Sequence, residues 1–335
     1  TLGRSRRRNP PFRLVAPLLC AVLLTACAPD APQDSTATVS TTAPATTPAT
    51  DATTVPTTSS ADTTAITTGS TVSLADRPFD VFVPSTYDSS TPMPLVVLLH
   101  GYGATGAIQE AYFGLQPLAE QRGFLYVHPD GTKDPLGNQF WNATDACCQR
   151  LTEDVDDVGY LMALVDDVSS RYSVDPDRIW FLGHSNGGFM SHRLACDRAD
   201  RVAAIVSLAG ATWLDESKCA PSEPVSVLQI HGTEDQTIDY DDGGALFFRG
   251  YPGAETTVSS WARKDACTGG LVPVDETLDL EVSLEGAEST VTRTSGCPDG
   301  VDVELWTIVG GAHIPGLSPT FTPMVVDWLF AHPKP

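Results

Sequence analysis

The fold is decided at Arg178-Ile179-Trp180-Phe181-Leu182-Gly183-His184-Ser185-Asn186-Gly187, where an apolar run leads directly into a glycine–serine motif. Residues 178–182 have the pattern of a buried strand, and residues 188–195 have the pattern of an opening helix. In Gly-x-Ser-x-Gly the serine occupies a sharp strand-to-helix turn, and the flanking glycines relieve the crowding there. A bare match is weak, but a strand before it and a helix after it are the context that the motif requires. Ser185 is therefore predicted to be a nucleophile.

The remainder of the chain from residue 71 alternates between apolar runs and helical patterns. Continuous apolar runs of this kind are typical of strands buried on both faces of a parallel sheet. Strands are predicted at 94–99, 124–127, 203–208, 225–230 and 303–308, and helices at 155–172 and 321–330. The prediction is one α/β domain over residues 71–335, with a mostly parallel, doubly wound sheet.

A serine nucleophile needs a histidine base, and in this strand–serine–helix arrangement the chain order is serine, acid, histidine. His313 follows the last predicted strand on a glycine-rich loop, from which an imidazole can reach the serine. His192 is expected on the surface of the helix after the serine, His231 at a strand end, and His332 at a frayed terminus. His313 is the predicted base.

The orienting acid is expected where the strand before His231 ends, in Ile230-His231-Gly232-Thr233-Glu234-Asp235. Asp235 is the favoured residue, with Glu234 and Asp239 as the alternatives. A buried acid at this place would fix the tautomer of His313 and stabilise its imidazolium.

The oxyanion of an acyl-transfer reaction needs backbone donors that are already in place. One is expected from the N–H of Asn186, the residue after the nucleophile. The other is expected from the N–H of Tyr102, in the loop His100-Gly101-Tyr102-Gly103 after the first long strand. His100 itself is expected to brace this loop.

With these residues in place, the chain resembles the secreted poly(3-hydroxybutyrate) depolymerase-like and feruloyl esterase-like α/β hydrolases. The resemblance rests on motifs spread over residues 71–335: Leu98-Leu99-His100-Gly101, Trp141-Asn142-Ala143 with Cys147-Cys148, Asp156-Asp157-Val158-Gly159, Gly183 to Gly188, His231 to Asp235, and Gly310-Gly311-Ala312-His313. It implies the α/β-hydrolase fold and the triad Ser185, Asp235 and His313. It also implies that Trp141 lines the acyl pocket, and Tyr102 and His184 are assigned to the same substrate-binding wall.

Two departures from the family pattern lie beside the predicted pocket. Ile314-Pro315 stands where members often carry Trp-Pro after the catalytic histidine, and Tyr102 stands where many have cysteine or a small residue. A tyrosine in the oxyanion loop can offer its ring face to an aromatic acyl group. Mechanism therefore carries over from the family more securely than substrate does.

The first 70 residues carry targeting signals and no chemistry. A basic cluster, a short apolar run from Leu14 to Ala26 and the tetrapeptide Leu24-Thr25-Ala26-Cys27 predict a lipoprotein signal peptide over 1–26 and lipidation of Cys27. An ordinary signal peptide is the alternative. Residues 27–70 are dominated by Thr, Ala, Pro, Ser and Asp, which predicts a disordered stalk, with or without sugar.

The domain's six cysteines, an even number in a chain predicted to be exported, indicate disulfides. Cys267–Cys297 is the preferred pair, followed by Cys196–Cys219, which leaves Cys147 with Cys148. The histidines are not grouped near these cysteines, and no metal or organic cofactor is predicted. A net charge of −22 argues against nucleic acid and anionic membrane surfaces as partners.

The predicted function is that of an exported, cell-surface serine carboxylesterase, expected to be a monomer that meets a membrane only through its lipid anchor. Its substrates would be small or polymeric esters: feruloyl or acetyl esters, or polyesters such as polyhydroxybutyrate. Two alternatives remain open at this stage. One is an acyltransferase or peptidase on the same fold, and the other is a non-catalytic surface lipoprotein.

Overall fold

The structure is a computed structural model of the 335-residue chain and describes residues 73–148, 155–246 and 248–335. These residues belong to one compact unit, Ile66–Pro335. The predicted signal peptide 1–26, the predicted lipidation residue Cys27 and the predicted stalk 27–70 all lie outside the described residues.

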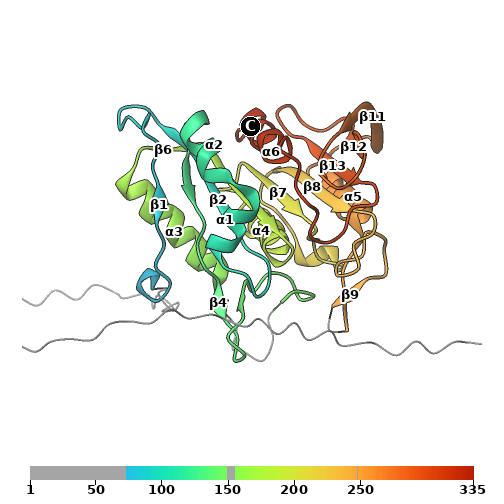
Figure 1. The fold of residues 1–335 in the computed structure, drawn as a ribbon, viewed down its shortest axis with the longest axis horizontal. Helices are drawn as coiled ribbons and strands as arrows, with labels where there is room; N and C mark the ends of the chain where they lie inside the picture. The colour runs from blue at the N-terminus through green and yellow to red at the C-terminus, as the bar shows by residue number, and fades with distance from the viewer. Residues whose placement is uncertain (1–72, 149–154, 247) are drawn as a thin grey trace, which may run out of the picture. The chain divides into compact units, whose positions relative to one another are not determined.

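A nine-stranded sheet forms the centre of this unit, in the order β1-β3-β2-β6-β7-β8-β13-β12-β11 (Figure 1). From β3 to β13 neighbouring strands run parallel, and β1, β12 and β11 extend the two edges in antiparallel pairing. The strands are β1 (Val81–Phe82), β2 (Met93–Leu99), β3 (Leu125–Val127), β6 (Val174–His184), β7 (Ala204–Leu208), β8 (Ser226–Gly232), β11 (Leu271–Leu278), β12 (Ser289–Thr294) and β13 (Val303–Ile308). Two short ribbons pair β4 (Thr132–Lys133) with β5 (Gln139–Phe140) and β9 (Ala245–Leu246) with β10 (Arg249–Gly250).

Helices cover both faces of the sheet because its strands are apolar on both sides. Alternate residues of β2 show this: Leu95, Val97 and Leu99 enter one core, whereas Val96 and Leu98 enter the other. The first core receives α3 (Asp157–Arg171), α4 (Asn186–Asp197) and α5 (Ala254–Lys264). The second receives α1 (Gly106–Phe113), α2 (Leu115–Arg122) and α6 (Phe321–Ala331). Short 3-10 helices lie at Leu74–Asp76 and Glu216–Lys218.

The predicted α/β fold is confirmed, and every strand and helix predicted from the pattern is present within a few residues of its expected bounds. Helices α1, α2 and α5 were not predicted. Within the described part of the chain, disulfides join Cys267 to Cys297, Cys196 to Cys219 and Cys147 to Cys148, as expected. The first encloses β11 and β12, and the second ties α4 to the loop after β7. Among the described residues, no helix is long and apolar enough to span a bilayer.

Two histidine placements were wrong. His192 is fully buried rather than on the helix surface, because the central helix α4 is covered by the sheet on one side and by Trp261 of α5 on another. His332 is not at a frayed end: the Trp180 indole donates to its carbonyl at 2.9 Å, and its ring lies 2.8 Å from Asp302 Oδ2.

Candidate active site

The serine turn at the end of β6 is strained in the way the motif predicts. Ser185 has φ 54° and ψ −119°, a left-handed conformation that is costly for a residue with a side chain. A Cβ on Gly183 would lie 2.1 Å from the carbonyl of Gly187, and a Cβ on Gly187 would lie 2.1 Å from the Leu99 oxygen. Only glycine fits at either place, so the two glycines allow β6 to turn directly into α4.

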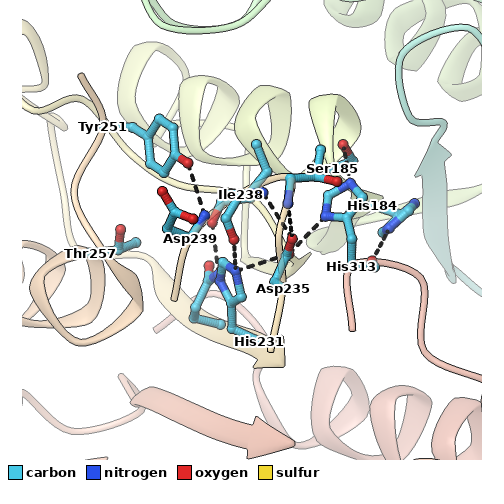
Figure 2. A network of polar contacts seen from close by, with 12 residues as sticks. His184, Ser185, His231, Asp235, Ile238, Asp239, Tyr251, Thr257 and His313 are labelled. Atoms are coloured by element: carbon cyan, nitrogen blue, oxygen red, sulfur yellow. Dashed lines mark hydrogen bonds and ion pairs between the residues drawn. The ribbon is translucent and has the colours of Figure 1, made fainter. Parts of the chain in front are cut away.

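Ser185, His313 and Asp235 come together from three different loops at one edge of the sheet (Figure 2). His313 Nε2 lies 2.9 Å from Ser185 Oγ, and His313 Nδ1 lies 2.7 Å from Asp235 Oδ2. Both are hydrogen-bond distances, with the imidazole correctly placed between hydroxyl and carboxylate. The other two acids considered from the sequence, Glu234 and Asp239, are exposed.

Asp235 is a buried carboxylate held in its charged form. Burial opposes ionisation, but hydrogen bonds from His231 and His313 outweigh it, so the pKa of Asp235 lies well below its usual range. Its other oxygen accepts the Thr237 and Ile238 backbone N–H groups at 2.8 and 2.9 Å. The carboxylate is therefore both ionised and fixed in orientation.

The predicted oxyanion loop lies directly beside the serine. A Cβ on Gly101 would lie 3.5 Å from Ser185 Cβ, and the Gly101 N–H donates to Gln109 Oε1 at 3.1 Å. His100 braces the loop as expected, because its Nε2 accepts the Gly131 N–H at 2.8 Å. Asn186 is the first residue of α4, where an N–H has no acceptor within the helix. Asn186 and Tyr102 stay the predicted oxyanion donors.

The comparisons with known proteins agree with this geometry. Residues 86–246 match the phospholipase/carboxylesterase family. Feruloyl esterase B of Piromyces equi is 29% identical over 70% of this chain and 42% of its own length. Poly(3-hydroxyalkanoate) depolymerase C of Paucimonas lemoignei is 28% identical over 69% of this chain and 56% of its own. The chain thus spans about half the length of these two relatives.

A solved structure supports the fold. The acetyl xylan esterase from Aspergillus awamori superposes with a TM-score of 0.52 at 18% identity, covering 75% of this chain and 93% of that one. The chain has the α/β-hydrolase fold, and its Ser185, His313 and Asp235 are arranged like the triad of a serine hydrolase. The family resemblance found in its motifs is confirmed by the relatives named above.

Ser185 opens into an apolar cavity of about 380 Å³. Its lining is Gly101, Tyr102, Ala104, Ile108, Gln109, Tyr112, His184, Ser185, Thr237, His313 and Ile314. Ile108 and Ile314 are 59% and 65% exposed, which makes the rim apolar as well. Ile108 and Tyr112 belong to α1, a short helix without a marked apolar stripe, which is why sequence patterning missed them.

Of the three residues predicted to bind substrate, Tyr102 and His184 line the cavity. Tyr102 lines it, with its hydroxyl donating to Asp134 Oδ2 at 2.5 Å. His184 lines it too, and burial lowers its pKa to about 4. Neutral His184 therefore donates from Nε2 to the His313 carbonyl at 2.9 Å and steadies the backbone of the base.

Trp141, the third residue, does not line this cavity. Its side chain is completely buried, its indole donates to the His100 carbonyl at 3.1 Å, and it is not part of the cavity lining. Its backbone N–H and carbonyl are held by the Asn186 side chain at 2.7 and 2.9 Å. Trp141 is therefore a core residue whose backbone holds Asn186, the first residue of α4, in place.

Proposed function

We propose that this protein is a hydrolase, an exported carboxylesterase that cleaves esters through an acyl-enzyme formed on Ser185. The observation that carries the proposal is the 2.9 Å contact of Ser185 Oγ with His313 Nε2 at the wall of an apolar cavity. The contact is supported by Asp235, which is 2.7 Å from the opposite nitrogen of His313.

The proposed reaction follows from these contacts. Ser185 Oγ attacks the ester carbonyl carbon while His313 Nε2 takes the hydroxyl proton, and ionised Asp235 stabilises the imidazolium. The oxyanion accepts hydrogen bonds from the N–H groups of Asn186 and Tyr102. His313 returns its proton to the leaving alkoxide, which departs as the alcohol. Water, deprotonated by His313, then attacks the acyl-enzyme. His313 returns that proton to Ser185 Oγ as the acyl–oxygen bond breaks and the acid is released.

The apolar cavity favours substrates with an apolar acyl group over charged ones. The ring of Tyr102, the ring of Tyr112 and the rim residues Ile108 and Ile314 would contact the acyl chain. Tyr112 donates its hydroxyl to the Pro315 carbonyl at 2.6 Å, so its ring is presented in a fixed position. Relatives named feruloyl esterase and poly(3-hydroxyalkanoate) depolymerase support aromatic or hydroxyalkanoate esters as the substrate class.

Export is supported by the disulfides, since such bonds persist in oxidising compartments. We propose that Cys27 carries a lipid anchor, that this anchor is the chain's only membrane attachment, and that the enzyme acts as a monomer. Replacing Cys27→Ser should then release the enzyme from the membrane fraction into the medium. Membrane retention of this variant would contradict the anchor and leave the esterase assignment untouched.

A panel of soluble esters tests the activity. Methyl ferulate, 4-nitrophenyl acetate and a 3-hydroxybutyrate dimer should be assayed with the wild type and with Ser185→Ala. Hydrolysis of at least one ester by the wild type, lost in the variant, is expected. Hydrolysis of none of them, or equal rates for both proteins, would overturn the proposal.

A further inference from the structure

A chain of buried polar side chains continues behind the acid, on the side away from Ser185. His231 lies near Asp235, with Nε2 2.9 Å from the Ile238 carbonyl and 3.3 Å from Asp235 Oδ2 (Figure 2). Its Nδ1 lies 3.1 Å from Gln229 Nε2. The polar path to the serine therefore does not end at Asp235.

The chain continues into the core between β8, α4 and α5. Gln229 Oε1 lies 3.0 Å from His192 Nε2, and His192 Nδ1 lies 2.9 Å from the indole nitrogen of Trp261. Gln229, His192 and Trp261 are fully buried, and His231 is 1% exposed. Four polar side chains without solvent must satisfy one another.

The indole N–H of Trp261, at the far end of the chain, determines which ring nitrogen carries the proton in His192 and in His231. Trp261 Nε1–H can only donate, so His192 Nδ1 must accept and His192 must carry its proton on Nε2. Burial lowers the pKa of His192 to about 4, in agreement with a neutral ring. His192 Nε2–H then requires the oxygen of the Gln229 amide, which turns the amide nitrogen toward His231.

The Gln229 amide in turn determines the tautomer of His231. The Gln229 amide donates one hydrogen to the Gly210 carbonyl at 2.8 Å and the other to His231 Nδ1. His231 must therefore carry its proton on Nε2, where the Ile238 carbonyl and Asp235 share it. A second proton on His231 would face the Gln229 amide donor, and a second proton on His192 would face the indole donor.

We propose that Trp261, His192, Gln229 and His231 form a hydrogen-bond chain with a single proton arrangement, which holds Asp235 and, through it, His313. On this view His231 and Gln229 are positioning residues, because they act on the reaction only through Asp235. The inference rests on the proposed function for its effect on catalysis, but the proton arrangement itself does not.

Titratable groups face His231 from several elements of the fold. They are Asp235 on the following loop, Tyr240 with its ring edge-on at 5.8 Å, and His313 and His184 beyond Asp235. Burial raises the pKa of Tyr240, so it stays neutral, and Asp235 is the only one of these that is an anion at neutral pH. A cationic His231 would thus compete with His313 for the same carboxylate.

Nitrogen-15 NMR of the histidines in Ser185→Ala tests the proton arrangement without any dependence on activity. The chain has seven histidines, and His192→Gln and His231→Gln identify the two signals. At pH 7 both rings should show the neutral pattern with the proton on Nε2. The opposite tautomer at either ring, or a cationic His231, would overturn the proposal even if the enzyme proves to be an esterase.

Kinetics of paired variants test the positioning role. Trp261→Phe keeps the stacking on His192 but removes the donor; kcat should fall about threefold or more, and the acid limb of the pH profile should move. Trp180→Phe is the matched control: its buried indole donates to the His332 carbonyl on the other face of the sheet, and its profile should stay as in the wild type.

At His231 itself, the amide of glutamine can supply the Nε2–H donor but cannot titrate. His231→Leu should lower kcat about tenfold with KM within twofold, and His231→Gln should recover most of that loss. Equal losses in both His231 variants, or equal profiles for Trp261→Phe and Trp180→Phe, would reduce the chain to ordinary core packing and overturn the positioning role.

Discussion

Two histidine–aspartate pairs of nearly equal length lie in different parts of this molecule. His313 Nδ1 is 2.7 Å from Asp235, and His332 Nε2 is 2.8 Å from Asp302. In both pairs the histidine lowers the pKa of the aspartate. By distance alone the two pairs cannot be told apart.

The two pairs differ in the exposure of the aspartate and in the group that the second histidine nitrogen contacts. The Asp235 side chain is 0% exposed, and the far nitrogen of His313 meets Ser185 beside the apolar cavity. The Asp302 side chain is 40% exposed, and the far nitrogen of His332 donates to the Trp328 carbonyl at 2.6 Å. The ring of His332 also packs against the ring of Trp328 at a tilt of 30°, with ring centroids 4.0 Å apart.

The second pair therefore fastens the end of α6 to the sheet and has no reactive group to activate. Glu304 lies beside it, close enough for the three side chains to suggest a metal site. Both Glu304 oxygens are already used, however, by Arg293 at 2.7 Å and the Trp306 indole at 3.2 Å. A histidine–aspartate pair can serve catalysis by a serine only where that serine and a substrate cavity lie next to it.

The largest effect is expected where the two pairs differ most, at the nucleophile. Ser185→Ala removes the hydroxyl that only the first pair contacts, so kcat/KM on an ester should fall by about 10⁴-fold or more. Steady-state kinetics with an unchanged melting curve as control would measure this. A loss of less than about tenfold would place the chemistry on another residue.

Breaking each pair in turn tests the comparison itself. Asp235→Asn should lower kcat by about 10³- to 10⁴-fold, because His313 loses the anion that fixes its tautomer and stabilises its cation. Asp302→Asn should leave kcat within about twofold. Comparable activity losses in the two variants would mean that the surroundings do not separate the pairs.

Asp265 can be compared with Asp235, because it is also a buried aspartate but accepts its hydrogen bond from the Val225 backbone N–H instead of a histidine. Burial raises its pKa to about 7, and among the described residues its Oδ2 has no hydrogen-bond partner. Folding then favours the protonated form, so this contribution to stability is complete below about pH 4 and is lost as pH rises toward 7.

Asp265→Asn, which stays neutral, should therefore be more stable than the wild type at pH 8, by about 2 kcal/mol. At pH 4 the two proteins should differ little. Urea unfolding at both pH values measures the difference, and a variant that is destabilised equally at both would show that Asp265 is ionised in the fold.

The smallest effect concerns the stability supplied by the second pair. Asp302→Asn should cost about 1 kcal/mol or less at pH 7, because a carboxylate this exposed is screened by solvent. Since its pKa is lowered in the fold, the contribution is present above the ordinary aspartate range and is lost as pH falls below it. Thermal unfolding at pH 7 and pH 3 checks both parts, and a larger cost at pH 3 would contradict them.

The sequence predicted Ser185, Asp235 and His313 because each lies within a few residues after an apolar strand, and parallel strands deliver their carboxyl ends to one edge. It did not predict the roles of Gln229 and His192, since nothing local shows which helix covers them. The signal that was available is the pair Gln229 and His231 at alternate positions of a buried strand, beside the apolar residues Val227, Leu228 and Ile230. Polar side chains there must find buried partners. Trp141 was predicted at the pocket from the family resemblance alone, which says nothing about how its side chain packs in this chain.

Labelling with a fluorophosphonate tests the central claim most directly, because the reagent modifies only a serine that is activated by its base. The wild type should be labelled at Ser185, with the modified residue identified by peptide mass spectrometry. Asp302→Asn should be labelled at the wild-type rate, and Asp235→Asn far more slowly. An unlabelled wild type, or a label on a residue other than Ser185, would contradict the account.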